Sequence, residues 1–267
     1  MTYTICTFYF ELDNIQTIKN NKNYCSKNYL DSFFKIKNRA QNLYVWIDEK
    51  YYNELKDYAN DNTIIIKKNI TELRLYKYKN KIIECLIDMN NKRNKNVYSS
   101  LFKQHCNFNS IAEYIILNNS KFDIIKEACD TNPYNSELFM WIDFGVFQHP
   151  SIIKNFPDNI KPKYTKNIKI NYNISNNNIS NYNINKFNKL SLLNDQSVEF
   201  VCTLFTINKF FYYNFYNEYC NYMDKLLEES LFSTEQGILT MFFYDNSLFN
   251  KYEIEKGIYQ TIHKLLE

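Results

Sequence analysis

Leu138-Phe-Met-Trp-Ile-Asp-Phe-Gly145 places five apolar residues directly before one carboxylate and, two positions later, a glycine. A short apolar run that ends at turn residues is typical of a strand buried on both faces of a sheet. Runs of the same kind occupy residues 3–10, 43–47 and 63–66, and the second of them is followed by Asp48. The sequence therefore predicts four strands, two of which deliver a carboxylate at their C-terminal end.

Helical spacing of apolar residues separates the first three strands. Phe33 and Phe34 belong to such a pattern between the first two, and Tyr51 and Leu55 to another between the second and third. This alternation predicts an α/β fold of the Rossmann type, with a mostly parallel central sheet and helices on both faces. Sheets of this kind bind their ligands at the C-terminal ends of the strands.

The remainder of the chain is predicted to be mainly helical. We expect a strand over 198–207, and helices over 110–129, 210–227, 234–244 and 254–266. Pro133 interrupts the helical pattern, because a proline disfavours helix in the residue before it.

Residues 160–188, which are rich in Asn, Ile and Tyr, are predicted to be a low-complexity surface insertion. Their alternation of Ile and Asn also fits a hairpin. With that segment set aside, the 267 residues fit one domain, 1–267.

Composition and charge exclude several classes of protein. An aromatic content of 18% excludes disorder for most of the chain, and a net charge of +3 with interleaved signs argues against a nucleic-acid partner. The seven cysteines form no CxxC pair and are typical of reduced thiols in the cytoplasm. Since no apolar stretch reaches the length of about 18 residues that a membrane span needs, we expect a soluble, cytoplasmic protein.

Asp143 is the first candidate for chemistry, because it closes an apolar strand and Gly145 lets a ligand approach the backbone closely. A carboxylate there suits a hard divalent cation, Mn2+ or Mg2+, which takes further ligands from substrate phosphates. Asp143 fits a strand cap or a turn equally. Asp48 has similar alternatives, a nucleotide contact or a turn, and His149 is the one histidine near the candidate site.

The second candidate lies in Ser233-Thr-Glu-Gln-Gly237, at the entrance of a predicted helix. Ser233 or Thr234 can cap this helix, and Glu235 in its first turn complements the helix dipole. A carboxylate at a helix entrance that faces the same crevice as Asp143 also fits an acceptor hydroxyl contact or a general base.

Three motifs in this order resemble the HtrL/YibB-like family, whose members are taken to be glycosyltransferases of bacterial surface-polysaccharide gene clusters, with relatives in large DNA viruses. They are Asn118-Asn-Ser-Lys-Phe-Asp-Ile-Ile-Lys-Glu-Ala128, Asn132-Pro-Tyr-Asn-Ser136 and Phe139-Met-Trp-Ile-Asp-Phe-Gly145. The family's downstream "D-Q" corresponds to Glu235 and Gln236. The opening strand also resembles the start of the family, so that the likeness covers most of the chain.

This resemblance implies a fold of the GT-A type and a nucleotide-sugar donor. Many GT-A enzymes carry a D-x-D motif whose carboxylates hold a metal ion on the donor diphosphate. The matching residues here are Asp143-Phe-Gly145, so the second carboxylate is missing, and Glu235 replaces the aspartate of the family pattern. The strand near 201–206 also lacks the glycines that the resemblance leads us to expect.

The resemblance also implies roles for individual residues. Asp143 would hold Mn2+ or Mg2+, and Glu235, next to Gln236, would bind or deprotonate the acceptor hydroxyl. Lys121 would contact donor phosphate or sugar. The remaining donor-side candidates are Asn132, Ser136, Asp48, Trp141 and Gly145, with His149 as a further possibility.

The function expected from the sequence is transfer of a sugar, of the hexosyltransferase type, from a nucleotide sugar to a hydroxyl of a glycan or glycoprotein. A viral member would work in the host cytoplasm. The alternative is a GT-A-like binding or assembly module that has lost catalysis, since the second carboxylate is missing. A metal-assisted phosphoester hydrolase ranks last, because it needs more ligands than Asp143 and His149 provide.

Overall fold

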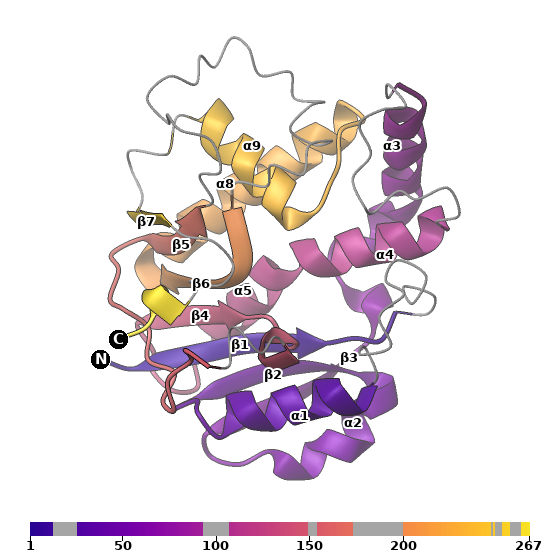
Figure 1. Ribbon diagram of the computed structural model, residues 1–267. Coiled ribbons are helices and arrows are strands. Elements are labelled where there is room, and N and C mark those ends of the chain that lie inside the picture. The colour runs from indigo at the N-terminus through magenta and orange to yellow at the C-terminus, as the bar shows by residue number, and fades with distance from the viewer. Residues whose placement is uncertain are drawn as a thin grey trace.

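The computed structural model describes residues 1–12, 26–92, 107–148, 154–172, 200–246, 248, 253–256 and 263–267. Within these ranges one seven-stranded sheet has the strand order β3-β2-β1-β4-β6-β5-β7, and helices lie above and below it (Figure 1). The strands are β1 Tyr3–Tyr9, β2 Leu43–Asp48, β3 Thr63–Lys68, β4 Leu138–Ile142, β5 Ile168–Tyr172, β6 Phe200–Asn208 and β7 Glu253–Lys256.

The sheet is mostly parallel. Strand β1 pairs in parallel with β2 and with β4, β2 with β3, and β5 with β7. Only β6 runs antiparallel to its neighbours β4 and β5 among the strands that the structure describes. These pairings confirm the predicted α/β fold with a mostly parallel central sheet.

Helices cover both faces of the sheet, as predicted. The α-helices are α1 Ser26–Lys37, α2 Glu49–Leu55, α3 Lys79–Lys92, α4 Phe108–Asn119, α5 Lys121–Thr131, α8 Lys209–Glu228 and α9 Glu235–Asp245. Short 3-10 helices are η2 Lys56–Tyr58, η3 Ile70–Glu72, η4 Tyr76–Tyr78 and η6 Val146–Gln148. No helix in the described ranges is long and apolar enough to cross a membrane.

Two apolar layers hold these helices to the sheet. On one face, α1, α2 and η6 bury residues such as Phe33, Leu55 and Phe147 against the odd-numbered side chains of β1. On the other, α5, α8 and α9 bury residues such as Phe122 and Tyr212 against the opposite face. Each strand of the central group therefore packs on both sides, which explains its continuous apolar sequence.

The strand order reverses beside β1. The chain passes from β1 outward to β2 and β3, and then returns to place β4 on the other side of β1. In open α/β sheets, the crevice outside the carboxyl ends of the strands at such a reversal is where ligands bind. The residues that follow β1 and β4 therefore lie where a ligand is expected to bind.

The structure corrects three predicted elements. The helix predicted over 110–129 is two helices, because Ser120 ends α4 and precedes α5. Strand β5 lies within the 160–188 segment and buries Ile168 and Ile170. This part of the segment therefore belongs to the sheet and is not a surface insertion. Residues 173–188 lie outside the described ranges. The helix predicted over 254–266 is wrong over 254–256, because 253–256 form β7; residues 263–265 form a short 3-10 turn, and 257–262 lie outside the described ranges.

Candidate active site

Asp143 follows β4 at the reversal of strand order. Its backbone N–H donates to the carbonyl of Thr203 at 2.8 Å, and its own carbonyl accepts from the N–H of Val146 at 2.9 Å. The backbone is therefore fixed on both sides of the residue, while about a third of the side chain, 34%, stays exposed. A carboxylate that is held in place but reachable from solvent is suited to binding a ligand.

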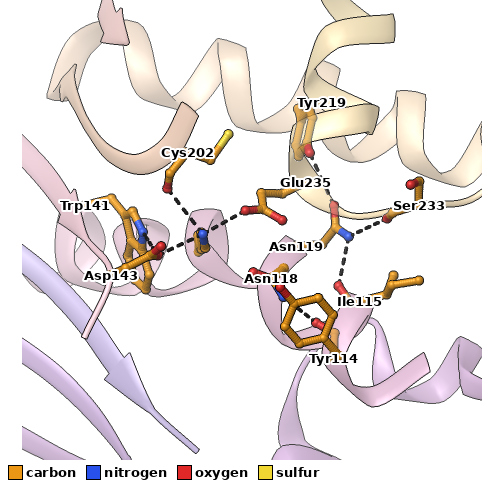
Figure 2. A network of polar contacts seen from close by, with 11 residues as sticks. Tyr114, Ile115, Asn118, Asn119, Trp141, Asp143, Cys202, Tyr219, Ser233 and Glu235 are labelled. Carbon is orange, nitrogen blue, oxygen red and sulfur yellow. Dashed lines mark hydrogen bonds and ion pairs between the residues drawn. The ribbon is translucent and has the colours of Figure 1, made fainter. Parts of the chain in front are cut away.

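The ammonium group of Lys121 lies at the centre of the site and contacts three other groups. Lys121 is the first residue of α5, and its Nζ lies 2.8 Å from Asp143 Oδ1 and 2.7 Å from Glu235 Oε1. It also donates to the carbonyl of Cys202 at 3.2 Å. Asp143, Cys202 and Glu235 converge from three separate parts of the chain in Figure 2. The two carboxylate oxygens are at most 5.5 Å apart, the sum of their distances to Nζ.

Trp141 supports this cluster from within the sheet. Its Nε1–H donates to Asp143 Oδ1 at 2.8 Å, and the Lys121 ammonium lies 5.4 Å from the centroid of its ring. The ring is buried against Phe8. Trp141 therefore orients Asp143 and has no free face on which a base or a sugar could stack.

Glu235 is the first residue of α9 and turns toward Lys121. The residue before it, Thr234, makes no side-chain hydrogen bond to the helix, so the predicted side-chain cap from that residue is absent. Glu235 Oε2 is buried and has no hydrogen-bond partner. Burial raises the pKa of Glu235 above its ordinary value, and the nearby Lys121 offsets this only in part.

Asn119 fixes the entrance of α9, a role that the sequence reasoning missed. Its amide Nδ2 donates to the carbonyls of Ile115 at 2.9 Å and of Ser233 at 3.0 Å, and Tyr219 donates its hydroxyl to Asn119 Oδ1. Figure 2 shows the three contacts around the one side chain. The signal was present, since Asn119 stands four residues after Ile115, where the apolar face of a helix continues.

The ionised forms of Lys121, Asp143 and Glu235 do not sum to a neutral cluster. Burial alone would lower the pKa of Lys121, but Asp143 and Glu235 outweigh it and raise that pKa, so the lysine is an ammonium. Burial and the charge of Glu235 raise the pKa of the nearby Tyr114 to about 12. With both carboxylates ionised, the three groups carry one net negative charge, which favours a cationic or hydrogen-bond-donating ligand.

A metal ion would have to bring ligands with it. No group of three or more potential His, Cys, Asp or Glu ligands occurs in the part of the chain that the structure describes. Asp143 Oδ1 already accepts from Trp141 and contacts Lys121, yet a third of the side chain is exposed. One carboxylate, with substrate phosphates and water as the other ligands, is a common way to hold Mg2+, so the residues fit a metal shared with a substrate.

Asn132 and Ser136 lie away from this cluster. They precede β4, at the opposite edge of the sheet from Asp143, and Ser136 Oγ is hydrogen-bonded to Thr4 Oγ1 near the start of β1. Asn132 ends α5 in the left-handed conformation, with φ of 32°, and Ser136 N–H donates to its Oδ1 at 2.8 Å. The structure therefore does not bring these two predicted donor-binding residues together with Asp143.

The remaining predicted residues are Asp48, Gly145, Gln236 and His149. Asp48 accepts a hydrogen bond from Lys50 N–H and caps α2, which agrees with the interpretation as a turn residue. Gly145 lies in the turn after Asp143 without a positive φ, so glycine is not required there by backbone conformation. Gln236 is half-buried beside Glu235, and His149 lies outside the described residues.

Three comparisons with known proteins bear on the chain. A family model described as "Bacterial protein of unknown function (HtrL_YibB)" matches residues 2–265. A search of curated proteins finds no match. Among solved structures, the chain is similar to the apo form of mouse xyloside xylosyltransferase 1, with 10% identity, coverage of 96% of this chain and 84% of that chain, and a TM-score of 0.40.

Proposed function

Since the chain belongs to the HtrL_YibB family, whose description names no activity, we propose from the site itself that the protein is a nucleotide-sugar-dependent glycosyltransferase. It would move a sugar, of the hexosyl type, to a hydroxyl of a glycan or glycoprotein. One observation carries this proposal: Asp143 follows β4 beside β1, where the strand order reverses. Open α/β sheets bind their ligands, nucleotides among them, in the crevice at this place.

The chemistry requires a group that stabilises a leaving diphosphate. The bond between the anomeric carbon and the diphosphate breaks, the diphosphate leaves with the electron pair, and the acceptor oxygen forms the new bond as it loses its proton. Asp143 is the residue we assign to hold a divalent cation, Mn2+ or Mg2+, against the donor diphosphate. Such a cation, when bound, supplies electrostatic stabilisation of the charge that develops on the leaving group.

Lys121 takes a different role from the one expected from the sequence. The three N–H donors of its ammonium are taken by two carboxylates and the carbonyl of Cys202, which leaves none for a phosphate. We therefore assign it to positioning Asp143, and not to contact with donor phosphate. We keep Glu235 as the proposed base through Oε2, which has no hydrogen-bond partner. This oxygen is buried, so the acceptor hydroxyl can reach it only when the site opens. A raised pKa brings a carboxylate closer to the pH at which it works best as a base.

A turnover assay tests the proposal. UDP- and GDP-sugars are incubated with the protein and Mn2+ or Mg2+, and the released nucleoside diphosphate is measured. We expect release from at least one donor, loss of release with EDTA, and a decrease of about a hundredfold or more for Asp143→Asn. Asp48→Asn is the matched control, because Asp48 also stands at the C-terminal end of a strand of this sheet but caps α2. Equal activity of the two variants would overturn the assignment.

A binding module without catalysis is the second candidate, and the engagement of both carboxylates by Lys121 favours it. Calorimetry separates the two. Binding of a nucleotide sugar without turnover in the presence of a range of sugar acceptors supports the module. Turnover supports the transferase, and a lack of any nucleotide binding contradicts both.

A further inference from the structure

Two side chains of α4 at the candidate site were not among the predicted site residues. Tyr114 and Asn118 are both half-buried, as Asp143 is. Asn118 Nδ2 donates to the backbone carbonyl of Tyr114 at 2.8 Å. Figure 2 shows the two side chains next to one another, below Asp143 and Glu235 in the view. They are therefore candidates for contact with a ligand that reaches the site from solvent.

The Tyr114 hydroxyl lies on the Glu235 side of the cluster. After burial, the charge of Glu235 is the largest cause of the raised pKa of Tyr114, and Asp143 contributes less. With a pKa of about 12, this hydroxyl is neutral at neutral pH and can donate a hydrogen bond. In the proposed transferase, Glu235 is the residue that receives the acceptor, so Tyr114 belongs to the acceptor side.

Both side chains have hydrogen-bonding capacity left for a ligand. The Asn118 amide nitrogen is directed at Tyr114, whose carbonyl and hydroxyl oxygens both interact with it. This leaves the Asn118 amide oxygen as an acceptor and the Tyr114 O–H as a donor. In the described ranges, neither oxygen is among the buried side-chain atoms that lack a partner. The capacity that is left therefore faces water, where a ligand can reach it.

A free cation is missing from this part of the site. In the part of the chain that the structure describes, the largest charge effects on Tyr114 and on Cys202 come from Lys121, Asp143 and Glu235. Lys121 is the one cation among them, and its three N–H donors are taken by two carboxylates and a carbonyl. An anionic group of a ligand would therefore leave water without a partner, which is costly.

We propose that Tyr114 and Asn118 bind a hydroxyl group of the acceptor beside Glu235, and that this acceptor is an uncharged sugar. The inference rests on the proposed transferase function. A hydroxyl group both donates and accepts, which matches the amide oxygen of Asn118 and the O–H of Tyr114. The net negative charge of the cluster repels the carboxylate of an acidic sugar.

Matched pairs of acceptors test the charge of the sugar. Release of nucleoside diphosphate is measured with and without the methyl glycosides of glucose, galactose and mannose. Each is compared with its uronic acid glycoside, in which a carboxylate replaces the primary alcohol. We expect at least one neutral glycoside to accelerate release, and its acidic counterpart to require a concentration about tenfold or more higher. An acidic glycoside that works as well as its neutral counterpart would overturn the inference.

The variant Tyr114→Phe, which removes only the hydroxyl, locates the contact. We expect the concentration of neutral glycoside that gives half of the maximal acceleration to rise about threefold to tenfold. The KM for the donor should change less than this. Tyr52→Phe is the matched control, because Tyr52 is half-buried on α2, at the other face of the sheet. Equal acceptor dependence in the two variants would contradict the assignment of Tyr114.

Failure of this inference differs from failure of the proposed function. Release of nucleoside diphosphate that no glycoside accelerates would overturn the inference, while turnover of the donor would still support the transferase. Absence of release from every donor would contradict the proposed function, and the inference with it.

Discussion

Lys121 contributes one ammonium group to two carboxylates, and its removal should be costly. In Lys121→Met the buried Glu235 would lose its partner and face Asp143 without a cation between them. Breaking a buried pair in this way costs about 3–5 kcal/mol. We expect the free energy of unfolding in urea to fall by this amount.

The control for that experiment is Lys126→Met on the same helix. Lys126 pairs with Asp130 at the surface, and pairs of that kind contribute about 1 kcal/mol or less. An equal loss of stability in both variants would contradict the claim that the buried ion pairs of Lys121 contribute more to stability than the surface pair of Lys126.

The buried carboxyl of Glu235 predicts a pH dependence. Because burial raises its pKa above the ordinary 4.5, the folded protein holds this proton more tightly than the unfolded chain does. The stability that the group contributes is therefore fully present below the unfolded pKa and is lost as the pH rises through the folded pKa.

The measurement is the difference in unfolding free energy between the native protein and Glu235→Gln, from about pH 4 to about pH 8. We expect this difference to shift against the native protein as the pH rises. A difference that stays constant, or that shifts in its favour, would contradict the raised pKa.

For single residues, the sequence predicted which side chains come together in the site better than it predicted what each of them contacts. Asp143 and Glu235 were singled out as candidates for one crevice, and the structure holds both against one ammonium. Lys121 was expected to contact a donor, yet its three N–H donors are taken by two carboxylates and a carbonyl of the protein. The break between α4 and α5 at Ser120 decides where its side chain points, and no Gly or Pro marks that break in the sequence.

Among the elements, the residue before the entrance of α9 is hydrogen-bonded to α4 through the side chain of Asn119. Asn119→Asp keeps the size of Asn119 but removes the amide that donates to Ser233 and Ile115. Buried carbonyls left without a donor cost about 1–3 kcal/mol. We expect loss of stability in this range, with faster hydrogen exchange at the first turn of α9.

Asn118→Asp is the matched control, because the neighbouring residue donates only to Tyr114 of its own helix. We expect hydrogen exchange in α9 to be unchanged in this variant. If it increased as much as in Asn119→Asp, the link between α4 and α9 would not be specific to Asn119.

The end of α5 gives a prediction of a different kind. Asn132 adopts a left-handed conformation that costs an alanine about 1–2 kcal/mol and glycine almost nothing. Asn132→Ala should therefore be less stable than Asn132→Gly by about 1 kcal/mol in thermal or urea unfolding. Since Asn132 lies at the far edge of the sheet, turnover of donor per folded molecule should equal that of the native protein in both variants. Reduced turnover in a stable variant would restore the predicted donor role.

Elements were predictable where side-chain pattern and burial agree. Strands β1 to β4 are apolar runs of a parallel sheet packed on both faces, and β6 was also predicted. Strand β5 was set aside because residues 160–188 are of low complexity, although Ile168 and Ile170, two positions apart, both lie in the core. Strand β7 was taken as helix, because the pairing with β5 that stabilises it is not encoded in its local pattern.

At the scale of the whole molecule, the strand order determines which residues lie in the crevice where this fold is expected to bind a ligand. The alternation of strands and helices predicts a parallel sheet, but it does not determine on which side of β1 the fourth strand lies. The placement of β4 beside β1 puts Asp143 at the reversal, while Asn132 and Ser136 lie at the other edge because they precede the same strand. The sequence could group these residues by proximity along the chain, and only the sheet separates them.

The most direct test of the account is a crystal structure with a nucleoside diphosphate and Mn2+ bound. We predict that the diphosphate lies outside the carboxyl ends of β1 and β4, with the metal ion in contact with Asp143 and with Lys121 still paired to Glu235. A diphosphate bound elsewhere, or bound at that edge with Asp143 untouched, would contradict the central claim.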